Sequence, residues 1–97
     1  WNGAVGRVRW MEAFADPAML RALGPADGIV ANIESGILRR LLPGLRDALA
    51  PGGWLILSGI PTEEWPVFEH DVRQTGFIRV AVEDDTGWTA GWFTRSS

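Results

Sequence analysis

The stretch DGIVANIESG, residues 27–36, joins an apolar run to an asparagine and then to the start of an expected helix. The apolar run does not alternate strictly with polar residues, which is typical of a strand covered on both faces in a parallel sheet. Asn32 ends this expected strand, and Ser35 is a residue type that caps helices. The stretch therefore predicts a strand over residues 27–32 that brings an amide side chain to a helix start.

The sequence that follows alternates expected helices and strands. Apolar residues recur at helical spacing from residue 37 to residue 49, and Pro43 interrupts them, which predicts a kink or a late helix start. The PGG sequence at residues 51–53 is expected to end the helix and turn the chain. A second apolar run, residues 54–60, then predicts another strand.

A further helix and a hairpin are expected toward the C-terminus. Thr62 with two acidic residues after it suits a helix start, and Gly76 suits its end. Runs at residues 77–84 and 88–95, linked by DTG, predict an antiparallel hairpin. The buried stripe of this helix is expected to consist of Trp65, Phe68 and Val72.

The order of elements predicts the fold class. Residues 7–11 are expected to form a short strand, and residues 15–24 one or two turns of helix. Alternating strands and helices predict right-handed crossovers and a mostly parallel sheet. We therefore expect an α/β domain whose mostly parallel sheet closes with an antiparallel hairpin.

Composition excludes several function classes. The 97-residue chain has a net charge of −3 and no dense basic block, so direct nucleic-acid binding is not expected. It has no cysteine and one histidine, which excludes disulfides and makes a metal site implausible. No apolar run is long enough to span a membrane, and no signal peptide is visible, so a cytoplasmic location is expected.

Four short motifs carry a family resemblance. They are ANI at residues 31–33, PGG at 51–53, LSGI at 57–60 and VEDDTGW at 82–88. In this order and spacing, the chain resembles the ribosomal protein L11 methyltransferase family from about residue 7 to residue 95. The resemblance implies a Rossmann-like, class I fold that uses S-adenosylmethionine to methylate amino groups of a protein, here a ribosomal protein. PGG alone is common among methyltransferases, whereas ANI with LSGI is more specific.

The resemblance covers only part of the family's catalytic domain. Its glycine-rich loop after the first strand and the acidic residue that ends its second strand have no counterpart in residues 1–97. Residues 1–97 are thus expected to be a partial catalytic domain from the third strand onward, with weak or no affinity for the cofactor. The alternatives are a non-enzymatic fragment or interaction module with a methyltransferase-like half-fold, and a doubly wound domain of another enzyme class.

The resemblance also implies the strand order third, second, first, fourth, fifth, seventh, sixth. Without the first two strands, residues 7–11 are expected to have no neighbour, and residues 28–32 to form a bare apolar edge. The isolated chain is then expected to self-associate through this edge, or to cover it with its own N-terminal strand.

Asn32 is the candidate catalytic residue. Ligands of open parallel sheets bind beyond the carboxyl ends of the strands, and its amide offers donors and an acceptor. The resemblance places Asn32 and Ile33 near the methionine end of the cofactor, with Asn32 orienting the acceptor amine. It places Glu12 and Ala13 near the adenine. A helix-entry turn is the alternative for Asn32, and a solvated loop is the alternative for Glu12.

Ser58, Gly59 and Ile60 end the second apolar strand at the same expected edge, and they are candidates for lining the acceptor pocket. A plain strand exit, where glycine permits the turn, is the alternative. Trp88 and Trp92 share one face of a strand, where core packing is favoured over base stacking because no basic groove accompanies them. His70 is expected on the polar face of its helix.

Overall fold

The computed structural model describes residues 8–11 and 26–96. Arg7, Glu12, Ala13 and the helix expected over residues 15–24 lie outside the described residues. Within the described parts the elements are β1 (Val8–Met11), β2 (Ala26–Asn32), α2 (Ser35–Ala48), β3 (Leu49–Pro61), the 3₁₀ helix η1 (Thr62–Glu64), α3 (Trp65–Gln74), β4 (Phe77–Asp85) and β5 (Trp88–Arg95).

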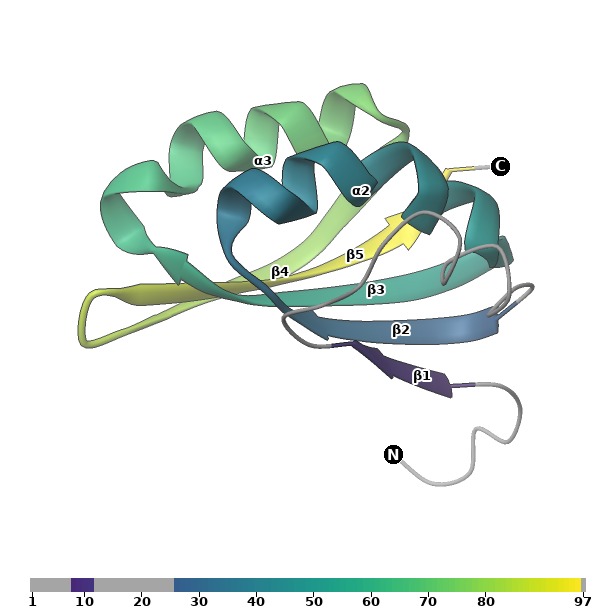
Figure 1. The fold of residues 1–97 in the computed structure, drawn as a ribbon, viewed down its shortest axis with the longest axis horizontal. Helices are drawn as coiled ribbons and strands as arrows, with labels where there is room; N and C mark the ends of the chain where they lie inside the picture. The colour runs from purple at the N-terminus through teal and green to yellow at the C-terminus, as the bar shows by residue number, and fades with distance from the viewer. Residues whose placement is uncertain (1–7, 12–25, 97) are drawn as a thin grey trace.

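These elements form one mixed sheet with helices against one face. The strand order is β1-β2-β3-β5-β4, in which β1, β2 and β3 are parallel and β5 runs antiparallel to both β3 and β4. Helices α2 and α3 lie side by side on the same face of this sheet (Figure 1). The expected α/β class, a mostly parallel sheet that closes with an antiparallel hairpin, is confirmed.

The first strand has a neighbour, contrary to expectation. β1 pairs with β2 in parallel, from Val8 opposite Gly28 to Met11 opposite Ala31. The expected bare edge at β2 is therefore wrong. The other alternative holds: the chain covers β2 with its own N-terminal strand, which satisfies backbone groups that an edge strand would leave unpaired.

Helix α2 begins at Ser35 and continues through Pro43. Its N-cap is Glu34, whose carboxylate accepts hydrogen bonds from the backbone N–H groups of Gly36 and Ile37, so the cap expected at Ser35 is wrong by one residue. The late helix start that Pro43 suggested is also wrong, because the helix already begins at Ser35. Pro43 lies on the exposed side. The stripe that holds the helix against the sheet, with members on both sides of the proline, is Leu38, Leu41, Leu42, Leu45 and Ala48.

The PGG sequence lies inside a strand instead of ending the helix. Strand β3 starts at Leu49, directly after α2, and its pairing with β2 jumps from Leu49 opposite Ala26 to Trp54 opposite Gly28. Gly52 has φ +79°, a conformation that L side chains rarely adopt. The expected turn is thus an irregularity of the register within one long strand.

The helix and the hairpin expected in the C-terminal half are confirmed, but Thr62 opens η1 and the α-helix begins only at Trp65. The buried residues of α3 are Trp65, Phe68 and Val72, and Pro66 lies in its first turn, where the missing N–H costs little. His70 is exposed, as expected. Strands β4 and β5 form the hairpin, and its two-residue turn has positive φ at Thr86 and Gly87.

The core lies between the sheet and the two helices. Phe68 of α3 and Phe93 of β5 are fully buried in it, and the Trp65 ring packs against both, with centroid distances of 5.7 Å and 6.1 Å. No helix in residues 26–96 is long and apolar enough to cross a membrane.

Candidate functional site

Two neighbouring parallel strands end at the same edge of the sheet. Asn32, the last residue of β2, lies opposite Ser58 of β3 in the register. The side chain of Asn32 is exposed, while Ile29 and Ala31 before it are fully buried. The carboxyl edge of parallel strands is where ligands bind in open α/β sheets, so this arrangement meets the geometric condition for a site.

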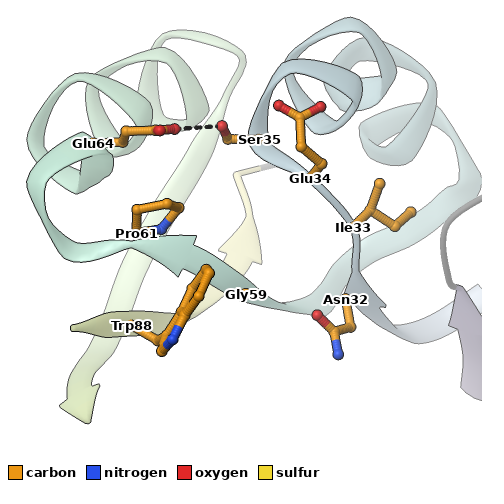
Figure 2. Close-up of a pocket in the computed structure, with 8 residues that line it drawn as sticks. All are labelled: Asn32, Ile33, Glu34, Ser35, Gly59, Pro61, Glu64 and Trp88. Atoms are coloured by element: carbon orange, nitrogen blue, oxygen red, sulfur yellow. Dashed lines mark hydrogen bonds between the residues drawn. The ribbon is translucent and has the colours of Figure 1, made fainter. Parts of the chain in front are cut away.

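A pocket of about 480 Å³ opens at this edge. Its walls come from the end of β2, the start of α2, the end of β3, η1 and the start of β5 (Figure 2). The lining residues are Asn32, Ile33, Glu34, Ser35, Gly59, Pro61, Glu64 and Trp88. Because five elements contribute, the pocket depends on the tertiary fold and not on any single loop.

Gly59 makes room for the amide of Asn32. Its φ is +82°, and a Cβ atom at this position would lie 2.5 Å from Oδ1 of Asn32. Figure 2 shows Gly59 between Asn32 and Trp88. Glycine is therefore favoured here for two reasons, the positive φ and the close approach of the Asn32 amide.

The starts of two helical segments form the acidic wall of the pocket. The Glu34 carboxylate accepts N–H bonds from Gly36 at 2.9 Å and from Ile37 at 3.3 Å. The Ser35 hydroxyl donates to Oε1 of Glu64 at 2.6 Å, which ties α2 to η1 (Figure 2). Among the described residues, neither Glu34 nor Glu64 forms an ion pair. Two such carboxylates favour a cationic group in the pocket.

Trp88 is a wall of the pocket and not part of the core. The side chains of Trp88 and Trp92 are 55% and 45% exposed, so the expected core packing of both is wrong. They do share one face of β5, as predicted, but it is the face opposite Phe93 and the helices. Period-two alternation identifies residues on one face without saying which face is covered.

The residues expected to line an acceptor pocket lie in different surroundings. Gly59 lines the pocket at the sheet edge, as do Asn32 and Ile33. Ser58 is half-buried beside Asn32 but is outside the lining. Ile60 is fully buried in the core, because the register of β3 against β5 shifts between Leu57 and Ile60 and turns its side chain toward the helices. Ile60 therefore does not line this pocket.

Five lining residues were not expected from the sequence as pocket residues, namely Glu34, Ser35, Pro61, Glu64 and Trp88. The order of the elements in the sequence does indicate that three of these residues lie at this edge of the sheet. Right-handed crossovers start each helix at the carboxyl edge of the preceding strand, which places Glu34 and Glu64 there. An antiparallel strand begins where its parallel neighbour ends, which places Trp88 opposite Pro61.

Comparison with known proteins gives a consistent result. Residues 9–96 match the family model described as ribosomal protein L11 methyltransferase (PrmA). A ribosomal protein L11 methyltransferase of Sorangium cellulosum is 61% identical over 63 residues, which is 65% of this chain and 19% of the relative. One of Brucella suis is 35% identical over 79 residues, covering 81% of this chain and 27% of the relative.

A solved structure agrees with the sequence relatives. The ribosomal protein L11 methylase of Lactobacillus delbrueckii subsp. bulgaricus superposes with a TM-score of 0.71 at 31% identity, over 76% of this chain and 38% of that chain. The chain matches 19% and 27% of the length of these two curated relatives, so it spans only a part of them. With a family model matched over nearly all of its residues, the chain belongs to the ribosomal protein L11 methyltransferase (PrmA) family.

Proposed function

We propose that this chain is the C-terminal part of an S-adenosylmethionine-dependent N-methyltransferase that acts on a ribosomal protein, L11. The relatives are named for that activity, and the chain matches their family model over residues 9–96. The observation that carries the proposal is the position of Asn32, whose exposed amide borders a pocket at the carboxyl edge of β2 and β3. Residues 1–97 would then be part of a longer catalytic domain.

The pocket residues suit the reacting ends of the two substrates. S-adenosylmethionine supplies an activated methyl group on a sulfonium ion. The amide of Asn32, with donors and an acceptor, can hold the acceptor nitrogen in line with that methyl group. Ile33 would border the methionine end of the cofactor. Glu34 and Glu64 favour entry of the acceptor as an ammonium ion, which must lose a proton before its lone pair can attack.

Positioning is the main contribution expected from these residues. When bound, S-adenosylmethionine would supply the methyl group for direct transfer to the acceptor nitrogen. Such a transfer would need no covalent link to the protein, so alignment and exclusion of water would supply the rate enhancement. Gly59 contributes by leaving the space that the Asn32 amide occupies.

Cofactor affinity of the chain by itself is expected to be weak or absent, because residues 1–97 contain no glycine-rich loop of the kind that approaches the cofactor in Rossmann-like folds. Titration calorimetry with S-adenosylmethionine tests this directly. Micromolar affinity of this chain alone would contradict the expectation. The predicted contacts of Glu12 and Ala13 with the adenine remain part of the proposal.

The activity is tested in a chimera that carries residues 9–96 in place of the matching segment of the Sorangium cellulosum relative. The chimera is expected to methylate L11. Asn32→Ala is expected to lower kcat by about 100-fold, the usual scale for losing a positioned polar group. Gln74→Ala removes an exposed amide from α3 and is the matched control. Equal activity of the two variants would contradict a catalytic role for Asn32.

A further inference from the structure

Two threonines and an aspartate tie the outer wall of the pocket together. Thr89 is buried, with 1% of its surface exposed, and its hydroxyl lies 2.6 Å from Oδ1 of Asp84 and 3.1 Å from Oγ1 of Thr62. An ionised carboxylate only accepts, so the single Thr89 proton goes to Asp84. The Thr62 hydroxyl therefore donates to Thr89. We call these three residues the threonine clamp.

Each threonine of the clamp directly follows a pocket-lining residue in the sequence. Thr62 follows Pro61 and comes two positions before Glu64, while Thr89 directly follows Trp88. The β3–β5 ladder ends with Pro61 opposite Trp88. Beyond that pair, the Thr62 N–H donates to the Gly87 carbonyl at 2.9 Å. The hydroxyl bonds and this backbone bond therefore hold η1 to the tip of the hairpin.

The tip of the β4–β5 hairpin needs such bonds to stay closed. Trp88 is 55% exposed and comes directly after the turn at Thr86 and Gly87, both with positive φ. Exposed hairpin ends with few apolar contacts open easily. A buried hydroxyl held between two strands and η1 opposes that opening, and it does so next to the pocket.

We propose that the threonine clamp is the positioning device of the acceptor pocket, in which Thr89 fixes the Trp88 ring and the η1 segment carrying Glu64 opposite Asn32. The identity of the ligand rests on the proposed function, whereas the placement of Trp88 does not. Thr89 is buried, does not line the pocket and acts through its neighbours, so it is a positioning residue. Its loss should loosen one wall of the pocket while the core remains intact.

The experiment uses the 97-residue chain and nuclear magnetic resonance. Thr89→Val removes the hydroxyl at nearly constant volume, Thr89→Ser keeps it, and Thr94→Val makes the same change on the opposite face of β5. Trp88→Phe assigns the Trp88 indole resonance. Thr89→Val is expected to shift that resonance and to speed exchange of the Thr62 amide about tenfold, the scale of one lost hydrogen bond. Thr89→Ser and Thr94→Val are expected to match the parent.

Binding of a primary-amine probe, N-acetyllysine methylamide, supplies the functional measurement. Thr89→Val is expected to weaken binding about tenfold, and Thr89→Ser to restore it. Unchanged Trp88 resonance and Thr62 exchange in Thr89→Val would overturn the clamp. If Thr89→Val fails to fold, Thr62→Val takes its place, because it removes the Thr62–Thr89 bond and keeps the Thr89–Asp84 bond. An unshifted Trp88 resonance in Thr62→Val would then refute the clamp. If the parent chain binds no amine while Thr89→Val shows the expected changes in the Trp88 resonance and the Thr62 exchange, the clamp is supported and the proposed ligand is contradicted.

Discussion

Replacement of Gly59 by alanine, compared with the same change at Gly52, distinguishes the cost of a strained backbone from displacement of the Asn32 amide. At φ +82°, an L residue is in the left-handed region, which costs about 1–2 kcal/mol. The added Cβ atom would also lie 2.5 Å from Oδ1 of Asn32. That oxygen is at the end of a rotatable side chain, so the amide is expected to swing away at a further cost of about 0.5–1.5 kcal/mol. The expected total loss of unfolding free energy is about 1.5–3.5 kcal/mol.

Gly52→Ala is the matched control. Gly52 has φ +79°, and a Cβ atom there would meet nothing within 4 Å. This variant should lose only the backbone contribution to the unfolding free energy, about 1–2 kcal/mol. Each kcal/mol lost should lower Tm by about 4–8 °C. Only Gly59→Ala should move the side-chain amide of Asn32.

Urea denaturation followed by circular dichroism measures both losses, and the side-chain NH₂ resonances of Asn32 report its position. Equal stability losses with an unmoved Asn32 resonance in Gly59→Ala would refute the argument that glycine makes room for this amide. A shift of the same resonance in Gly52→Ala would refute it as well, because residue 52 lies in the irregular start of β3 and not in the pocket lining.

Two further predictions concern stability alone. Phe68→Ala removes a fully buried ring packed against Trp65 and is expected to cost about 3–5 kcal/mol in urea denaturation, whereas Val67→Ala, at a side chain that is 62% exposed, should cost less than about 0.5 kcal/mol. Thr86→Asn should stabilise the chain by about 0.5–1 kcal/mol, because Thr86 has φ +47° and asparagine tolerates that region better in a two-residue hairpin turn; a lower Tm than the parent would contradict this.

The sequence predicts the elements well where a pattern has a local cause. The buried stripe of α3 follows from its apolar spacing, and the hairpin follows from the turn at Thr86 and Gly87. Helix α2 shows where such reasoning fails. Pro43 breaks the local pattern, yet leucines on both sides of it pack against the sheet, and this tertiary packing outweighs the lost backbone bond.

Pairing between distant segments was less predictable. No local signal indicates that β1 takes the place beside β2, because pairing depends on which strands are available to satisfy the exposed backbone groups. The PGG sequence has the composition of a turn, but β3 pairs with β2 on both sides of it, at Leu49 and again from Trp54, so it forms an irregularity within one strand. The tryptophans of β5 face away from the helices because α2 and α3 both cover the other face (Figure 1).

The candidate site follows from topology more than from motifs. Asn32 was recognisable because it ends an apolar strand, but Glu34, Glu64 and Trp88 have no distinctive sequence pattern. They reach the same pocket because helices start, and an antiparallel strand begins, where parallel strands end. The position of a residue relative to the strand ends therefore predicts this pocket better than its chemistry does.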